Sequence, residues 1–385
     1  MPWRTRDVME QRVELVIRAV QGGESISRLC GEYGISRPTA YLWIARYQEA
    51  GSVQGLAERS RRPRHSPEQT AREHEERVVE LRRLHSWGAK KLVVLLAREG
   101  IRLPVVTVNR ILKRRGLIAP EEVHRPATQR FARSAPNQLW QMDFKGPWRV
   151  AEGACYPLSI LDDHSRFLVG LHALASTGGA GVRAGLRQTF ETYGVPEAML
   201  MDHGTPWWSM TNGHGLTRLA VELIGQGIRL YYSGIRHPQT QGKVERLHRS
   251  LKHRLDGWGR PGSMAESAAA LAAFRDEYNQ VRPHEALDME VPAQHYHPSS
   301  RAYEPNPPAW EYEPGMEVKP LNSEGFLEYG HRRYFVCEAL AEHRVGSQRI
   351  ENKLLVRYRN AWIREIDIMS GRTSALVLPD QPPAV

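Results

Sequence analysis

Hydrophobic positions near the N-terminus recur at helical spacing. One helix is predicted with an apolar face formed by Met9, Val13, Val16, Ile17 and Val20. Ser25 is placed to cap a second helix and Ser36 to cap a third. Helix, glycine turn and helix, the last bearing Arg37 and Arg46, is typical of a helix-turn-helix DNA-binding domain, expected over residues 1–57. A purely structural three-helix bundle is the alternative.

A second helical set follows a basic, proline-containing linker at residues 58–67. Its helices are predicted at about Pro67–His85, Gly88–Arg98 and Pro104–Arg115. Their shared core is expected to contain Leu92, Leu95, Leu96, Val108, Ile111 and Leu112. We interpret residues 66–117 as a second helix-turn-helix-like helical domain.

From residue 136 the pattern changes to short apolar runs and amphipathic segments. Three successive strands are predicted at Leu139–Val150, Tyr156–Leu161 and Phe167–Leu174. Helices and strands then alternate, with helices at Gly181–Tyr193, Leu216–Gly225, Gly242–Leu255 and Met264–Tyr278, and strands at Ala198–Met201 and Ile228–Tyr231. This order predicts an α/β domain with a mixed sheet over residues 136–297.

A proline-rich linker at residues 298–316 precedes a last run of short strands. These strands are predicted at Gly325–Tyr329, Arg332–Val336, Arg344–Ile350, Lys353–Tyr358 and Trp362–Ile368. They indicate a small β domain, a barrel or a sandwich, at residues 317–378.

Charge is distributed unevenly along the chain. The net charge is +10, yet residues 1–135 hold 26 Lys+Arg against 15 Asp+Glu, whereas the remaining residues hold 27 against 28. The basic excess therefore coincides with the two helical sets. Such a region favours nucleic-acid binding, with an ordinary solvated surface as the alternative.

Composition also limits the cell compartments in which the protein is expected. The chain has no apolar run of the roughly 18 residues that a membrane helix needs, and its first residues lack a signal-peptide pattern. The three cysteines, Cys30, Cys155 and Cys337, form no pair at metal-ligand spacing. We expect a cytoplasmic protein with no membrane partner, no disulfides and no zinc site.

Three acidic residues occupy positions suited to a catalytic centre. Asp143 lies inside an otherwise apolar strand, Asp202 directly follows the strand AMLM, and Glu245 lies at the start of a helix. Carboxylates that converge from separate elements suit Mg²⁺ or Mn²⁺, and two such ions can activate a nucleophile and stabilise the leaving oxygen of a phosphodiester. Taken singly, each residue also fits an edge, turn or helix-dipole role.

Longer motifs around these residues resemble a known family. The strings LWQMDFKG, DDHSRF, MLMDHGTP, HPQTQGKVERLHRSLK and YNQVRPHEAL resemble the integrase core of bacterial insertion-sequence transposases. That family is related to retroviral integrases and has a ribonuclease-H-like fold. The resemblance covers roughly residues 137–297 and implies metal-binding catalytic carboxylates at Asp143, Asp202 and Glu245, with a basic DNA-contacting residue at Lys252.

Several neighbours of these motifs need separate interpretation. Lys243 and Arg246 flank Glu245 and are candidates to hold DNA phosphates. The pair Asp162 and Asp163 is expected to be structural and is left out of the metal set. Two aromatic residues, Trp207 and Trp208, are expected in the core, with stacking on unpaired bases as the alternative.

The resemblance implies a DDE transposase that binds the inverted repeats at the ends of its own element. It would hydrolyse phosphodiesters at those ends and join the freed 3′-hydroxyls to target DNA by metal-dependent transesterification. Because two ends must be held together, we expect at least a dimer on DNA. A nuclease without strand transfer and an inactive, domesticated DNA-binding regulator are the alternatives.

Overall fold

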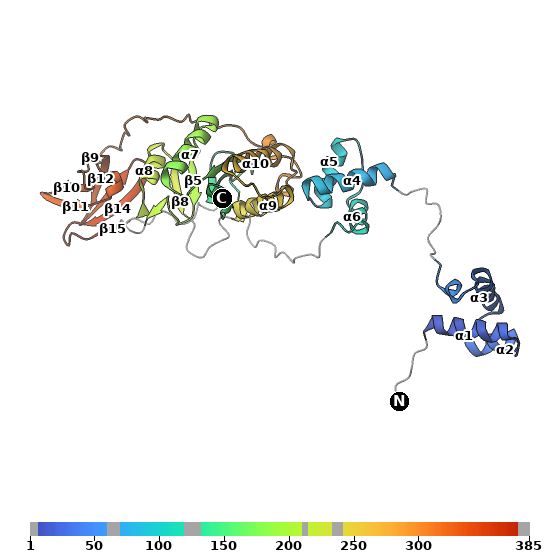
Figure 1. Cartoon of the computed structure of the whole chain (residues 1–385). Helices are drawn as coiled ribbons and strands as arrows, with labels where there is room; N and C mark the ends of the chain where they lie inside the picture. The colour runs from blue at the N-terminus through green and yellow to red at the C-terminus, as the bar shows by residue number, and fades with distance from the viewer. Residues whose placement is uncertain (1–6, 60–69, 119–131, 210–214, 233–241, 376–385) are drawn as a thin grey trace. The chain divides into compact units, whose positions relative to one another are not determined.

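The structure, a computed structural model, describes residues 7–59, 70–118, 132–209, 215–232 and 242–375. The chain divides into two compact units, Met1–Thr70 and Ala71–Val385 (Figure 1). Among the described helices, none combines the length and apolar character that crossing a membrane requires.

Three helices and one short 3-10 turn form the first unit: α1 (Val8–Gln21), α2 (Ile26–Tyr33), α3 (Arg37–Ala50) and η1 (Val53–Leu56). Both predicted caps are confirmed, because the Ser25 and Ser36 hydroxyls accept hydrogen bonds from backbone N–H groups in the first turns of α2 and α3. Gly34 adopts a φ of 64°, which lets the chain turn sharply between them. The core contains Leu15, Val16, Leu29, Cys30, Ala40, Trp43 and Leu56.

The second helical set opens the second unit. It comprises α4 (Arg72–His85), α5 (Ala89–Arg98) and α6 (Val105–Arg114), close to the predicted ranges. All six residues predicted for its core are buried. Val281, from the later part of the chain, packs against this cluster.

A mixed sheet forms the centre of the second unit. Its strands are β1 (Trp140–Phe144), β2 (Trp148–Val150), β3 (Gly153–Asp162), β4 (Leu168–Leu174), β5 (Ala198–Met201) and β8 (Arg229–Tyr232). The main path runs β2-β3-β1-β5-β8, and β4 pairs with the other edge of β3. β3 is antiparallel to both β1 and β4, whereas β1–β5 and β5–β8 are parallel. The predicted mixed sheet is therefore confirmed.

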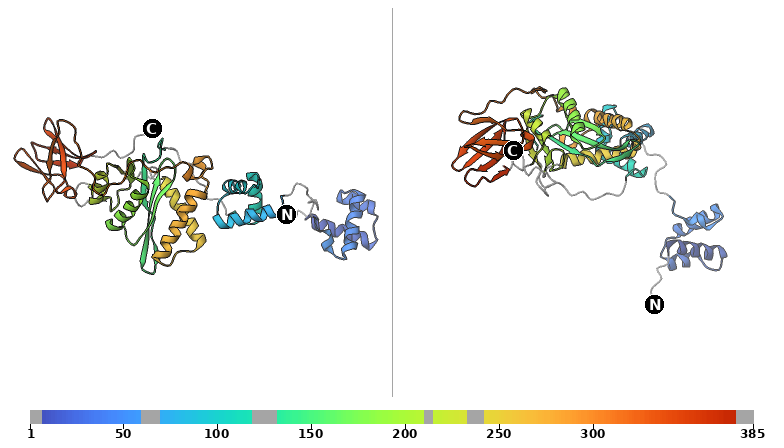
Figure 2. Two further views of the ribbon diagram at one scale, coloured as in Figure 1. Left: turned by 90° about the horizontal axis from the view of Figure 1, so that it is seen from above. Right: turned by 60° about the vertical axis from the view of Figure 1, so that its left-hand side comes forward.

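Helices cover both faces of this sheet (Figure 2). The apolar side chains of α7 (Gly179–Tyr193) and α8 (Arg218–Gly225) belong to one core cluster, and those of α9 (Gly242–Trp258) and α10 (Met264–Asp276) belong to another. Because a helix pair covers each face of the sheet, polar functional groups are expected at the ends of the strands.

Three predicted elements differ from the structure. The strand predicted at Leu139–Val150 is wrong as a single strand, because it is broken into β1 and β2 around Gly146-Pro147, and proline cannot donate to a sheet ladder. The helix predicted to reach Tyr278 ends at Asp276 and continues as a π-helical turn, η3 (Glu277–Val281). The helix predicted from Leu216 begins at Arg218, after a small hairpin of β6 (Trp208–Ser209) and β7 (Gly215–Leu216).

Two 3-10 turns, η4 (Glu285–Leu287) and η5 (Pro292–Gln294), lead towards the C-terminal β region. Its strands are β9 (Glu317–Pro320), β10 (Phe326–Tyr329), β11 (Arg332–Phe335), β12 (Arg344–Ile350), β13 (Lys353–Tyr358), β14 (Ala361–Asp367) and β15 (Thr373–Ala375). One sheet has the order β15-β14-β13-β12-β9, and β10 and β11 form a hairpin. The five predicted strands are present, whereas β9 and β15 were not predicted. Buried residues of this region share a cluster with α7 and α8.

Candidate active site

Asp143 lies on β1, in the middle of the sheet, where it is paired in register with Ser159 of β3. Its side chain is 22% exposed, so the carboxylate is largely removed from water without being sealed off. The backbone N–H of Phe144 donates a hydrogen bond to Asp143 Oδ1 at 2.8 Å. The predicted position in an apolar strand is confirmed, since Trp140 and Met142 on the same strand are fully buried.

Asp202 directly follows β5, the parallel neighbour of β1. Two groups hold its Oδ1 atom: the Trp207 indole N–H donates at 2.6 Å and the Gly204 backbone N–H donates at 2.9 Å. A Cβ atom at position 204 would lie 2.9 Å from that oxygen, so glycine allows the turn to close tightly. The turn therefore fixes the carboxylate beside the end of its strand.

Trp207 contributes to this turn as a core residue. It is 1% exposed and stacks on Phe144 of β1, with ring centroids 5.3 Å apart. The expectation that Trp207 is in the core is confirmed. Its role as a hydrogen-bond donor to Asp202 was not predicted, and the only sequence signal is its position five residues after the aspartate.

Glu245 lies in the first turn of α9 and is exposed. Burial raises the pKa of Asp143 to about 7, and the charges of Asp202 and Glu245 act in the same direction against the opposing Phe144 hydrogen bond. Asp202 and Glu245 therefore both lie within electrostatic range of Asp143. Within the described ranges, however, no three His, Cys, Asp or Glu side chains are arranged closely enough to hold a metal ion.

His248 is a further residue at this site. Its Nδ1 atom lies 3.8 Å from Asp143 Oδ2, and its Nε2 atom makes a 3.0 Å hydrogen bond with Ser159 Oγ. Burial lowers the pKa of His248 to about 4, so the imidazole is neutral near pH 7. His248 was not predicted from the sequence, although its position three residues after Glu245 places it on a neighbouring part of the same helix face.

Comparison with known proteins identifies domains along this chain. Integrase core domain models match residues 133–238 and 226–292, a helix-turn-helix domain model matches residues 11–64, and a homeodomain-like domain model matches residues 39–112. The chain carries an integrase core and helix-turn-helix domains. It is therefore an enzyme of the transposase and integrase class, and the predicted fold class is confirmed.

Two relatives of this integrase-core protein come from insertion elements. An uncharacterized 31.7 kDa protein of insertion element IS407 from Burkholderia multivorans is 24% identical over 57% of this chain and 78% of its own length. An uncharacterized 39.2 kDa protein of insertion element IS476 from Xanthomonas euvesicatoria is 25% identical over 57% of this chain and 63% of its own length. The HTLV-2 integrase catalytic core domain, solved in complex with magnesium, is 15% identical, covers 43% of this chain and 99% of its own, and gives a TM-score of 0.34.

Basic residues of the integrase core gather beside the carboxylates. The pKa of Lys145, two residues after Asp143, is lowered by burial and then by the charges of Arg260 and Lys252. Lys252 is exposed on α9. The predicted DNA-contacting residue thus lies in a cationic cluster close to β1. Lys145 was not singled out from the sequence, although it follows Asp143 within the same motif.

Lys243 and Arg246, predicted to hold phosphates, have different surroundings. Lys243 Nζ pairs with the fully buried Asp163 at 2.5 Å, so its ammonium has a structural partner in the protein. Arg246 is exposed on α9. Asp162 accepts hydrogen bonds from Asn137 and Ser165, and Asp163 also accepts from Arg133 and Gln141. The structural role expected for this acidic pair is confirmed.

The predicted DNA-contacting residues of the first unit both lie on α3. Arg37 is exposed in the first turn, whereas the guanidinium of Arg46 lies 4.7 Å from the centroid of the Trp43 ring. Two apolar side chains on this helix, Tyr41 and Leu42, are 57% and 47% exposed. The exposed side of α3 thus mixes charge with apolar surface, a combination suited to a DNA groove. Contact with DNA by Arg37 and Arg46 stays a prediction.

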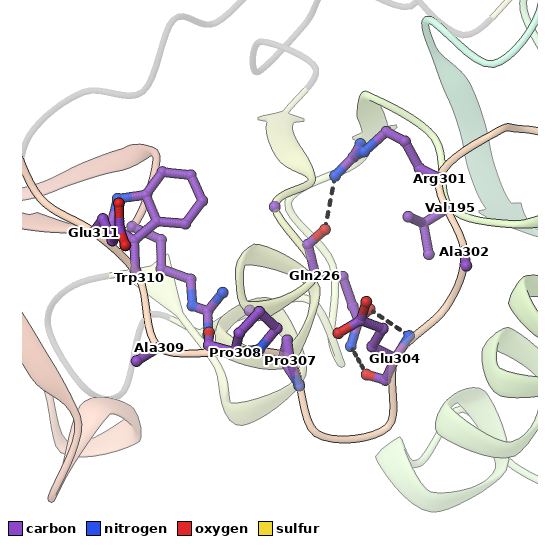
Figure 3. A pocket seen from close by; sticks show the side chains of 13 residues that line it. Val195, Gln226, Arg301, Ala302, Glu304, Pro307, Pro308, Ala309, Trp310 and Glu311 are labelled. Carbon is purple, nitrogen blue, oxygen red and sulfur yellow. Dashed lines mark hydrogen bonds between the residues drawn. The ribbon is translucent and has the colours of Figure 1, made fainter.

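A cavity of about 410 Å³ lies away from the carboxylates (Figure 3). It is lined by Gln226, Arg301 and Trp310 among others, and Arg301 donates a hydrogen bond to the Gln226 carbonyl oxygen at 2.8 Å. Gln226 precedes β8, whereas Asp202 follows the parallel strand β5. The cavity is therefore at the opposite ends of the parallel strands from the candidate active site.

Proposed function

We propose that this protein is a DDE transposase of an insertion sequence. It would bind the terminal inverted repeats through its helix-turn-helix domains, hydrolyse a phosphodiester at each element end and join the freed 3′-hydroxyls to target DNA. The observation that carries the proposal is that Asp143 lies on β1 and Asp202 directly follows the neighbouring parallel strand β5, with Glu245 on α9, all inside the matched integrase core. The insertion-element relatives support it.

Asp143, Asp202 and Glu245 would hold Mg²⁺ or Mn²⁺, in the proposed case two ions. The donor set fits, because it offers only carboxylate oxygens, which these ions prefer. The pKa of Asp143 is raised first by burial and then by the charges of Asp202 and Glu245, and a divalent cation would compensate both effects. When bound, the ions would activate the attacking hydroxyl group and stabilise the leaving oxygen.

The protein's own groups would position this chemistry. Trp207 and Gly204 hold one oxygen of Asp202, and the neutral His248 lies beside Asp143. Lys145 and Lys252 place positive charge where a phosphodiester would approach. These contacts fix the carboxylates before substrate arrives, which lowers the reorganisation that the reaction requires.

Two displacements at phosphorus account for the products. In the first, water attacks the phosphodiester at the element end, and the bond to the 3′-oxygen breaks, leaving a 3′-hydroxyl and a 5′-phosphate. In the second, that 3′-hydroxyl attacks a target phosphodiester and displaces a target 3′-oxygen. The first step hydrolyses a phosphodiester and the second exchanges one phosphodiester for another, so neither requires a covalent protein–DNA intermediate. Joining two ends to one target site calls for at least a dimer.

The decisive experiment incubates the purified chain with labelled element-end DNA and Mg²⁺ or Mn²⁺, and scores nicked and joined products. Asp143→Asn, Asp202→Asn and Glu245→Gln are each expected to abolish both products while DNA binding and the melting temperature are retained. Asp288→Asn is the matched control, because Asp288 is exposed, has a φ of 49° that asparagine tolerates, and lies outside the proposed site. Substantial joining by Asp202→Asn would contradict the proposal.

A further inference from the structure

Three cations meet where the second helical set contacts the integrase core. They are Lys91 on α5, Arg246 on α9 and Arg282, which follows η3, and we call them the basic junction. Arg282 connects the two parts directly. Its Nη2 atom donates to Ser250 Oγ on α9 at 3.1 Å, and its guanidinium carbon lies 5.5 Å from the ring centroid of Trp87, which precedes α5.

The other two members approach the same place. Arg246 lies one helical turn before Ser250, and the Ser250 hydroxyl donates to the Arg246 carbonyl oxygen at 3.1 Å, so both residues are on one face of α9. Lys91 is half-buried. Its pKa is lowered to about 7 by burial, then by the charge of Arg282, with Arg246 adding to the effect and Glu285 opposing it. The three positive charges therefore repel one another.

The acidic residues near the basic junction pair with residues outside it. Glu277 accepts from His85 and from Arg254, each at 2.7 Å. Glu285 lies 3.8 Å from Lys90, not from a member of the junction. In the part of the chain that the structure describes, no carboxylate lies within ion-pair distance of Lys91, Arg246 or Arg282. Lys91 and Arg282 are partly withdrawn from water and have no directly paired carboxylate, which destabilises the folded protein.

A buried polar atom beside these charges also has no partner. His284 Nε2 is buried and makes no hydrogen bond within the described residues. The pKa of His284 is lowered to about 3 by burial, and then by the charges of Lys91 and Arg282, which places the ring close to both. The His284 ring also hydrogen-bonds the Tyr278 backbone, so Nε2 is an acceptor and takes no part in holding an anion. The three cations, which no described carboxylate pairs directly, indicate that an anion completes this site.

We propose that the basic junction binds a phosphodiester group of the DNA backbone, held by Lys91, Arg246 and Arg282. The two guanidinium groups match the geometry of phosphate oxygens, and the ammonium adds a third donor. This inference rests on the proposed function, because it takes DNA to be the substrate of the integrase core. It extends the DNA-contacting surface from α9 to α5, away from Lys252.

Binding to a labelled DNA duplex of arbitrary sequence, measured over a series of salt concentrations, tests the proposal without requiring catalysis. The variants are Lys91→Gln, which removes one charge, and Lys91→Arg, which keeps it. Arg187→Gln is the matched control, because Arg187 is an exposed cation on α7, which covers the opposite face of the sheet. The melting temperature of each DNA-free variant is measured alongside.

For Lys91→Gln we expect several-fold weaker duplex binding and a salt slope smaller by about 0.9, the value for one lost phosphate contact. Its melting temperature should be unchanged or higher, because a repulsive charge is removed. Lys91→Arg and Arg187→Gln should bind as the parent does. Unchanged duplex affinity for Lys91→Gln, or a lower melting temperature, overturns the proposal, since a purely structural lysine would behave in that way.

A second arm separates DNA from free phosphate. If inorganic phosphate raises the melting temperature of the parent but not of Lys91→Gln, while both bind the duplex equally, the junction takes free phosphate and the proposal is wrong. Absence of nicking and joining by the parent would overturn the proposed transposition alone. Duplex binding that is insensitive to Lys91 would overturn this inference alone.

Discussion

At Asp143, burial and neighbouring negative charge act together on a single carboxylate. Withdrawal from water is the larger cause of its raised pKa, and the charges of Asp202 and Glu245 add to it. A side chain of this kind is costly to keep unless a cation compensates it. The pKa of this one residue on β1 therefore reflects both its burial and the charges of the other two carboxylates.

Trp207 connects the hydrophobic core to the candidate active site. The variant Trp207→Phe tests this connection. Phenylalanine can keep the stacking on Phe144 but loses the 2.6 Å hydrogen bond to Asp202. A hydrogen bond to a charged acceptor contributes about 1.5–3 kcal/mol. We expect a melting temperature a few degrees lower, and joining that is strongly reduced at low Mn²⁺ and partly restored at high Mn²⁺.

Product yield as a function of Mn²⁺ concentration, together with a thermal melt, measures both effects of Trp207→Phe. Trp310→Phe is the control, because Trp310 lines the cavity at the other ends of the parallel strands. An Mn²⁺ dependence identical to that of the parent would mean that Trp207 serves the core only.

Lys252 tests the DNA-contacting face of α9. It lies seven residues after Glu245, nearly two helical turns or about 10 Å along the axis, so both side chains are on one face. Lys252→Ala is expected to lower the joining rate by tenfold or more (~1.4 kcal/mol or more) and to leave Mn²⁺ affinity intact, whereas Lys252→Arg retains part of the activity. Arg249→Ala, on another exposed part of the helix, should have a smaller effect.

Joining rate and Mn²⁺ affinity together decide the role of Lys252. An unchanged joining rate in Lys252→Ala would mean that Lys252 is an ordinary solvated surface residue without a role in DNA contact. Loss of metal affinity would mean that the substitution had disturbed α9 itself.

At the scale of elements, α9 has several roles at once. Its apolar residues Val244, Leu247, Leu251 and Leu255 pack in one core cluster, while Glu245 and His248 belong to the candidate site. On a further face, Arg246 belongs to the basic junction and Ser250 accepts a hydrogen bond from Arg282 of that junction. Because successive residues of a helix are about 100° apart, one short helix can serve the core, the carboxylates and the junction.

The environment of Lys91 on α5 predicts a pH effect on stability. The folded protein releases the Lys91 proton near pH 7, whereas an unfolded chain keeps it until about pH 10. The unfolded state therefore binds more protons between these values, and the contribution of Lys91 to the free energy of unfolding rises with pH. The charges that act on Lys91 are those of Arg282, Arg246 and Glu285.

Lys91→Met removes the titrating group and leaves the other groups unchanged. The stability gained over the parent should be largest at about pH 6 and should shrink by about pH 9, where the parent lysine is mostly neutral. The melting temperatures of Lys91→Met and the parent are measured at several pH values and subtracted, so that the effects of other titrating groups cancel. A difference that is constant with pH would show that Lys91 keeps an ordinary pKa in the folded state.

At the scale of the whole molecule, function is divided between a basic N-terminal third and a nearly neutral remainder. A fragment of residues 1–135, which holds both helical sets, is expected to bind element-end DNA specifically. Its affinity should fall steeply with salt, because each neutralised phosphate releases counterions. Competition with unrelated duplex DNA across a salt series measures both properties.

Arg37→Ala within this fragment should weaken binding, since Arg37 is exposed at the start of α3. Arg187 lies outside the fragment, so Arg59→Ala, which removes an exposed arginine already paired with Glu49, serves as the control. If residues 136–385 bound the ends with equal specificity and the fragment did not, recognition would lie in the remainder of the chain.

The sequence by itself determined the helices and strands and the order of the candidate catalytic residues along the chain. Hydrophobic periodicity located the helices, Ser25 and Ser36 marked two caps, and the strand AMLM predicted β5 without error. Such features depend on neighbours a few residues apart, which the sequence displays directly. The motif around Glu245 indicated the family for the same reason, although its first residues, 237–241, lie outside the described ranges.

Only the tertiary structure decided which side chains share an environment. It paired Lys243 with Asp163, 80 residues away, and placed Trp207 against Asp202 and Phe144. It also brought Lys91 beside Arg246 and Arg282, from segments that no local pattern connects. These relations arise when separate elements pack on one sheet and on one another, and the burial and charge that result are properties of the folded chain alone.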